Sequence, residues 1–169
     1  MSPPPDERGS VGRITLKRAD IFELIRADAL LRAAPFVKAI GAKAEALLKN
    51  GIARRYPDRA VLFQTGDAGN SLFLVLNGEV RLSGRKDSDV VELGTAGRGE
   101  VFGEPELLSG GPQRFNSAVA HGDVEAAEIP REALLEKGLI LKDVAEFLRP
   151  LKEARLQKLS EMTDFMSRW

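Results

Sequence analysis

The strongest constraint on the fold of this chain is a close alternation of short apolar runs and turn-forming residues between positions 52 and 129. Runs such as Leu72–Leu76 are separated by Gly- and Asn-containing segments such as residues 66–70. Each run has the length of a strand rather than that of a helix. Many short strands at regular spacing are typical of an antiparallel barrel or jelly roll. Asn77-Gly78 stands between two of the runs and predicts a tight hairpin turn.

Helical periodicity flanks this zone on both sides. Apolar side chains recur three and four positions apart in residues 14–51 and again in residues 130–169. Residues 1–13 are rich in Pro, Gly and charge, which predicts a disordered tail. We therefore expect an α+β fold with an antiparallel β-roll or jelly-roll barrel at residues 52–129. N-terminal helices (14–51) and C-terminal helices (130–169), including one long helix, should flank the barrel.

The C-terminal segment carries a stripe at spacings of three and four residues, formed by Leu148, Leu151, Arg155, Leu159, Met162, Met166 and Trp169. The stripe can pack onto the barrel or form a two-helix dimer seam, and both can occur along one helix. Arg155 weakens a purely apolar seam. Gly138 is expected to interrupt the helical segment, and Pro150 to kink or restart the last helix.

Composition argues against several classes of function. The chain has no cysteine and a single histidine, so it lacks a disulfide framework, a thiolate site and a multi-histidine metal site. Basic and acidic residues balance at 25 each, which leaves no large positive field for nucleic acid. No apolar run approaches the ~20 residues of a membrane span. We expect a cytoplasmic protein without cofactor or metal that contacts neither nucleic acid nor membrane directly.

One segment combines residues that can bind a ribose phosphate. Gly103 lets backbone approach a ligand, and residues 105–108 can form a helical turn whose free N–H groups favour an anion. Arg114 can fork onto a phosphate, and Glu104 can accept hydrogen bonds from sugar hydroxyls. The same spacing also fits a surface turn with a solvated arginine. Glu104 and Glu106 lack an accompanying nucleophile, so we do not expect an enzyme.

Residues 52–129 as a whole resemble the cyclic-nucleotide-binding domain family. The matching motifs are Gly66-Asp67, Gly69-Asn70-Ser71-Leu72-Phe73-Leu74-Val75-Leu76-Asn77-Gly78-Glu79-Val80, Gly97, Val101-Phe102-Gly103-Glu104, Leu107-Leu108, Arg114, Val124 and Ala127-Glu128-Ile129. With the flanking helices, the resemblance covers roughly residues 30–165. The spacing from Glu104 to Arg114 is similar to that in the bacterial catabolite-activator branch.

The resemblance implies a receptor for cAMP or cGMP that signals by moving its C-terminal helix. In the family, the residue matching Glu104 contacts the ribose 2′-hydroxyl, and the residue matching Arg114 pairs with the cyclic phosphate. Amides near Glu106 and Leu107 help to hold the phosphate, and Ser160 falls near the base-contacting position. The implied ligand-binding residues are Phe102, Gly103, Glu104, Glu106, Leu107, Arg114, Phe115, Asn116 and Ser160.

Four residues depart from the family pattern. Glu106 places a carboxylate where members usually have a small residue, and its charge opposes a phosphate. Pro105 removes an amide donor, and Gln113 replaces a frequent proline. Phe115 can stack on a purine or fill the pocket.

These departures leave a second function open: a degenerate member that binds no nucleotide and serves as a protein-interaction or dimerisation module. The apolar residues Met162, Phe165, Met166 and Trp169 then contact an unknown protein partner or a second copy. The sequence has no room for a helix-turn-helix after the last helix, so direct DNA binding is not expected.

Overall fold

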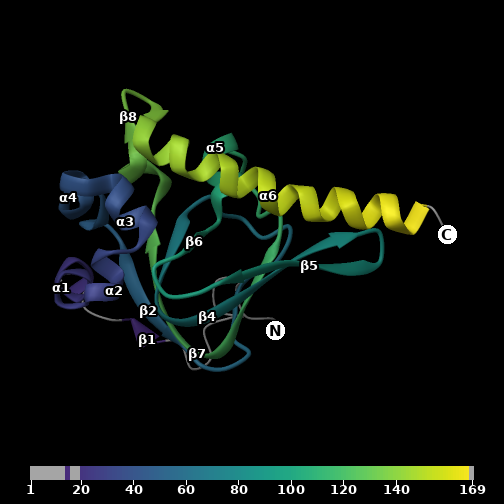
Figure 1. The fold of residues 1–169 in the computed structure, drawn as a ribbon, viewed down its shortest axis with the longest axis horizontal. Coiled ribbons are helices and arrows are strands. Elements are labelled where there is room, and N and C mark those ends of the chain that lie inside the picture. The colour runs from purple at the N-terminus through teal and green to yellow at the C-terminus, as the bar shows by residue number, and fades with distance from the viewer. Residues whose placement is uncertain (1–13, 16–19, 168–169) are drawn as a thin grey trace, which may run out of the picture.

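The computed structural model describes residues 14–15 and 20–167, so the expected tail at residues 1–13 and Trp169 lie outside the described residues. Antiparallel strands form a roll, small helices gather at one end of it, and one long helix runs along its side (Figure 1). This arrangement confirms the predicted β-roll flanked by helices. Within the described part of the chain, no helix is both long and apolar enough to cross a membrane.

The sheet of the roll contains seven strands among the described residues. They are β1 (Ile14–Thr15), β2 (Ile52–Tyr56), β3 (Val61–Phe63), β4 (Leu72–Lys86), β5 (Asp89–Ala96), β6 (Val101–Phe102) and β7 (Ser117–Ile129). Their order is β1-β2-β7-β4-β5, with β3 paired to β7 and β6 paired to β4. Alternate side chains of these strands point into the roll, where Phe73 and Phe102 stack with ring centroids 5.0 Å apart.

The predicted hairpin turn at Asn77-Gly78 is wrong. Strand β4 continues through both residues and pairs with β7 on either side of them, with register shifts at Asn77. Gly78 has φ 92°, and a Cβ there would lie 2.4 Å from the carbonyl oxygen of Asp123. The glycine therefore bends β4 close against β7 instead of reversing the chain. The tight turn lies further on, between β4 and β5, where Asp87 has φ 56°.

The helices before the roll are α1 (Asp20–Ala27), α2 (Ala29–Arg32), α3 (Pro35–Ile40), a 3-10 turn η1 (Gly41–Lys43) and α4 (Ala44–Leu48). Asp28, which interrupts the apolar periodicity, caps α2 by accepting hydrogen bonds from the amides of Leu30 and Leu31. The buried side chains of these helices share one core with Leu74 of β4 and Leu148 of the last helix. That shared core fixes the N-terminal helices to the roll.

The C-terminal segment differs from the expected run of helices at its start. A 3-10 turn η2 (Arg131–Leu134) leads into a hairpin of β8 (Leu135–Glu136) and β9 (Leu139–Ile140). The hairpin forms because Lys137 and Gly138 both adopt positive φ, which no helix allows. Helix α6 (Lys142–Ser167) follows as one helix.

Pro150 lies inside α6, so the expected restart of the helix there is wrong, and a kink stays a prediction. Proline removes the hydrogen bond to the carbonyl four residues earlier, that of Glu146. Both residues are exposed, so water can hydrate that carbonyl. On either side of Pro150, buried Leu148 and buried Arg155 hold the two halves of the helix against the roll. The side chains of Met162 and Met166 lie outside the description, and the dimer seam therefore stays a prediction.

Candidate functional site

The site begins where strand β6 ends and the short helix α5 (Glu104–Ser109) starts. The predicted helical turn at residues 105–108 is confirmed by this helix. Gly103 caps it with φ 94°, and a Cβ on Gly103 would lie 2.6 Å from the Ser71 carbonyl oxygen. The same Cβ would lie 3.1 Å from Nη1 of Arg114. Glycine is therefore required here by both backbone conformation and space.

Arg114 is buried, with only 4% of its surface exposed. Its Nη1 donates to the carbonyl oxygen of Ser71 at 2.9 Å, and its Nη2 donates to the Ser71 hydroxyl at 2.7 Å. The guanidinium carbon lies 4.3 Å from the ring centroid of Phe63 and 5.5 Å from that of Phe73. These contacts lock the cation in one place, because its position satisfies hydrogen bonds and cation–π attraction together.

Glu106 forms the ion pair with this cation. Its Oε2 accepts from Nη1 of Arg114 at 3.1 Å, and its Oε1 accepts from the amide of Phe115 at 2.6 Å. Burial raises the pKa of the Glu106 carboxyl, although the Phe115 amide and Arg114 oppose the shift. The expectation that Glu106 simply opposes a phosphate is thus incomplete. Its carboxylate sits on the arginine and the amide as a bound anion would.

Glu104 has an internal partner as well, instead of facing an open sugar site. Its Oε1 accepts from Nη1 of Arg155 on α6 at 2.7 Å. Glu104 is 1% exposed, and its Oε2 has no hydrogen-bond partner among the described residues. A buried carboxylate oxygen without a donor is costly, so this atom can accept one more hydrogen bond at a gain.

A chain of hydrogen bonds links Arg114 to the opposite strand. The Ser71 hydroxyl accepts from Arg114 and donates to Oε2 of Glu128 at 2.5 Å. Oε1 of Glu128 in turn accepts from Arg54 of β2 at 2.7 Å. Since each polar group has a partner, the network holds the buried arginine without leaving a charge alone.

A pocket of about 490 Å³ lies outside this buried layer, between the tip of the β4–β5 hairpin and α6. Phe115, which is 48% exposed, and Ser160 both line it. The other lining residues are Arg85, Lys86, Asp87, Leu156 and Leu159. The structure thus brings together the two residues expected near a base, and Phe115 does not fill the interior. Glu104 and Arg114 do not line the pocket.

The remaining expected site residues lie buried in the protein interior. Phe102 and Leu107 are fully buried in the two cores, and Asn116 is buried with its amide donating to the Ser117 carbonyl. Two important residues were missed, Ser71 and Arg155. Arg155 had a signal, because it is the one charged residue within an otherwise apolar helical stripe.

The family model described as the cyclic nucleotide-binding domain matches residues 53–137, half of the chain. The cyclic AMP receptor protein of Thermus thermophilus is 37% identical over 118 residues, covering 68% of this chain and 53% of its own length. Lysophospholipase NTE1 of Kluyveromyces lactis is 42% identical over 73 residues, covering 41% of this chain and 5% of its own.

The fold has solved counterparts too. The regulatory subunit of a cAMP-independent protein kinase A from Trypanosoma brucei superposes with a TM-score of 0.68 at 19% identity. The match covers 86% of this chain and 51% of that one. The chain therefore spans about half the length of the bacterial receptor and of the kinase subunit, and a small part of the lipase.

Proposed function

This chain belongs to the cyclic nucleotide-binding domain family, and from that premise we propose that it is a regulatory module that binds cAMP or cGMP by exchange. In this exchange the phosphate of the ligand replaces the carboxylate of Glu106 on Arg114. The family fold is regulatory, and the proposal concerns how its site works in this chain.

The observation that carries the proposal is the anion-binding position, here called the anion seat, that Glu106 occupies between Arg114 and the amide of Phe115. A buried guanidinium and the amide of Phe115 converge on one carboxylate, with contacts of 3.1 and 2.6 Å. A phosphate needs the same donors, and an arginine fork suits a phosphate at least as well as a carboxylate. The anion seat is thus preformed and filled by a tethered competitor.

The sugar and the base have positions that fit the same proposal. The partnerless Oε2 of Glu104 can accept from a ribose hydroxyl. The outer pocket, with Phe115 and Ser160 on its wall, has room for a base that stacks on the exposed ring. The same carboxylate accepts from Arg155 of α6 through its Oε1, so the sugar and α6 share one residue. Through this shared carboxylate, ligand binding shifts the position of α6 to the extent that the ligand binds one position more tightly than another.

A second candidate function is favoured by the same pair of internal contacts. Glu104 pairs with Arg155 of α6, and Arg114 pairs with Glu106, so residues of the chain itself satisfy both charges and dock α6. A module that is complete in this way can present α6 to a protein partner or a second copy without nucleotide.

Calorimetric titration of the full chain with cAMP and with cGMP tests the proposal. A matched control is the double variant Glu106→Ala/Arg114→Gln, which removes both charges and leaves neither buried alone. We expect measurable binding of one nucleotide to the wild type and none to the double variant. Equal heats for both proteins would refute the site. Absence of binding to the wild type and to the single variant Glu106→Ala would favour the nucleotide-independent module.

A further inference from the structure

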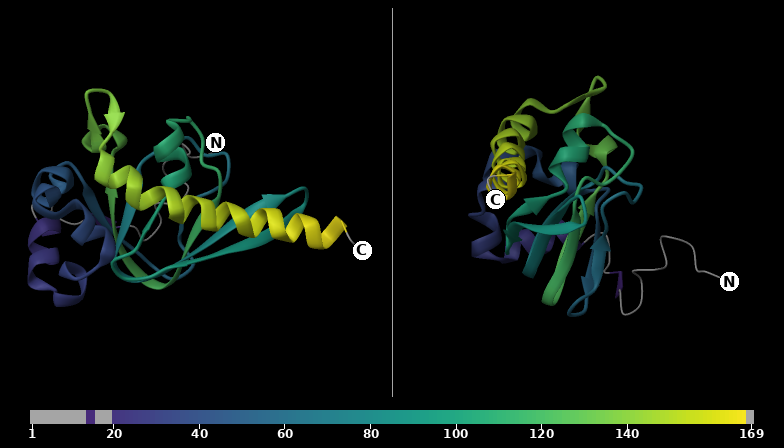
Figure 2. Two further views of the ribbon diagram at one scale, coloured as in Figure 1. Left: turned by 45° about the horizontal axis from the view of Figure 1, so that its top comes forward. Right: turned by 90° about the vertical axis from the view of Figure 1, so that its right-hand side faces the viewer.

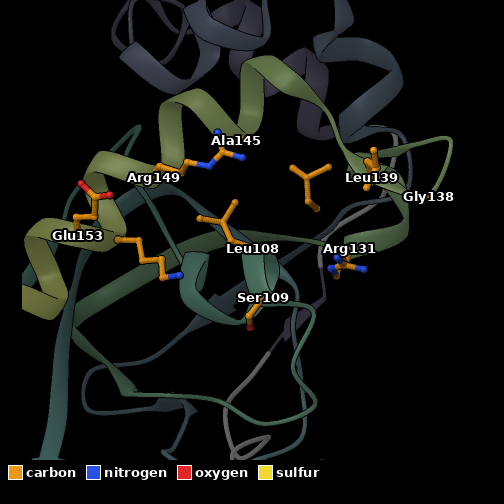
Figure 3. A pocket seen from close by; sticks show the side chains of 10 residues that line it. Leu108, Ser109, Arg131, Gly138, Leu139, Ala145, Arg149 and Glu153 are labelled. Atoms are coloured by element: carbon orange, nitrogen blue, oxygen red, sulfur yellow. The ribbon is translucent and has the colours of Figure 1, made fainter.

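A second cavity, of about 510 Å³, lies on the other side of α5 from the anion seat. Figure 2 shows α5 next to α6, and Figure 3 shows the cavity that opens between them and the β8–β9 hairpin. Leu108 and Ser109, at the end of α5, form one wall. Its volume falls within the roughly 300–1,000 Å³ of small-molecule sites.

The charged groups of this cavity are mostly cations. Arg131, Arg149 and Lys152 line it together with a single carboxylate, that of Glu153, which leaves a surplus of two positive charges. Among the described residues, the side chains of Arg149 and Lys152 have no acceptor or ion-pair partner. In Figure 3 the guanidinium of Arg149 points inward over Leu108.

Arg131, the third cation of the cavity, is held in a fixed position. Its Nε donates to the carbonyl oxygen of Leu107 at 2.8 Å, which fixes the plane of the guanidinium. Gly110 leaves room for it, because a Cβ on Gly110 would lie 3.1 Å from Nη2 of Arg131. A fixed guanidinium loses little freedom when it binds an anion, which favours a preorganised site.

The remaining lining is apolar. Leu108, Leu139, Ile140 and Ala145 contribute to the walls, and Leu139 is 73% exposed. An exposed leucine beside unpaired cations suits a ligand that has both an apolar body and an anionic group. Two surplus charges and two guanidinium groups match a phosphate dianion, which accepts paired hydrogen bonds from each fork.

We propose that this cavity, between α5, η2, the β8–β9 hairpin and α6, binds a phosphate monoester that carries a small apolar group. The ligand joins α6, through Arg149 and Lys152, to η2, through Arg131. None of its lining residues belongs to the Glu104, Glu106, Arg114 and Arg155 cluster, so the site is distinct from the proposed nucleotide site.

Titration calorimetry of the full chain with phenyl phosphate tests this site. The variant Arg149→Ala/Lys152→Ala should bind at least tenfold more weakly than the wild type, because it loses two of the three cations. The control Lys142→Ala/Lys158→Ala removes the same charge from exposed positions of α6 outside the cavity, and it should bind like the wild type. Circular dichroism of each variant serves as the control for correct folding.

Further results separate the possible outcomes. Phenyl phosphate should bind more tightly than inorganic phosphate and than uncharged benzyl alcohol, since both parts of the cavity are used. Unchanged binding by Glu106→Ala/Arg114→Gln is expected, and loss of binding there would assign the phosphate to the nucleotide site and overturn the proposal. Retention on phosphatidic acid vesicles without any response to phenyl phosphate would also overturn it, as would no heat with the wild type.

Discussion

Replacement of Glu106 by alanine should strengthen the binding of a cyclic nucleotide. The substitution removes the carboxylate that accepts from Arg114 at 3.1 Å and from the Phe115 amide at 2.6 Å. Arg114 keeps its two hydrogen bonds to Ser71 and its position over the ring of Phe63. The cation therefore stays in place while its anion seat becomes vacant.

The magnitude follows from the contacts that the ligand no longer has to break. A hydrogen bond to a charged group contributes about 1.5–3 kcal/mol net. A phosphate that displaces Glu106 accepts hydrogen bonds from Arg114 and the Phe115 amide in its place. The buried Glu106 carboxylate is then left without these donors, so the exchange loses at least one charged hydrogen bond. Removal of the Glu106 carboxylate should therefore tighten nucleotide binding by about 1.5–3 kcal/mol, or about 10- to 150-fold.

The same substitution should lower the stability of the ligand-free protein. Removing one partner of a buried ion pair costs about 3–5 kcal/mol, and the lower end applies here because Arg114 retains Ser71 and two aromatic rings. A ligand at about 100 times its Kd returns about 2.7 kcal/mol. Without nucleotide, the variant should therefore have a melting temperature well below that of the wild type. With nucleotide, its melting temperature should come close to that of the wild type.

Calorimetry with cAMP and cGMP measures the affinity, and thermal unfolding measures the stability. Glu106→Gln is the matched control, because it keeps the size of the side chain and removes its charge. It should gain affinity by less than the alanine variant, since its amide still occupies the seat. If the folded alanine variant binds both nucleotides no more tightly than the wild type, Glu106 does not compete with the phosphate and the exchange is wrong.

Three further predictions rest on the same geometry. Because burial raises the pKa of Glu106, its carboxyl takes up a proton at a higher pH than an exposed glutamate, and the competing charge disappears. Calorimetry at a series of pH values should therefore show nucleotide affinity rising in the wild type as the pH falls from neutrality toward the range in which glutamates titrate, and staying flat in Glu106→Gln. Arg155→Ala leaves Glu104 buried without its cation, and urea unfolding should show a loss of about 3–5 kcal/mol, whereas Glu104→Gln/Arg155→Met should lose clearly less. Gly66→Ala meets only an unfavourable φ and should cost about 1–2 kcal/mol, and Gly103→Ala should cost about 1–3 kcal/mol more because its Cβ also meets Ser71. Equal losses for the two glycine variants in urea would contradict the close packing at Gly103.

Local patterns in the sequence were sufficient for the main architecture. The alternating strand-like runs of residues 52–129 end where β7 ends, and helical periodicity appears on both sides of them. Glycine positions were harder to interpret, because Asn77-Gly78 has the residues of a turn and yet lies inside β4. A positive φ is all that the sequence indicates there, and the approach of Asp123 from β7 makes the chain bend and not reverse.

The amino-acid sequence indicated the β-roll and its helical flanks, and its family resemblance pointed to Glu104 and Arg114 as candidate ligand-binding residues. The charged partners of these two residues depend on the tertiary packing. Arg155 meets Glu104 from 51 positions away, and Glu106 turns back onto Arg114 across a glycine-containing loop. Such ion pairs depend on how helices and strands pack, since a buried charged side chain needs an oppositely charged partner close to it in the folded structure. The sequence shows the ionisable residues, and the packing selects their pairs.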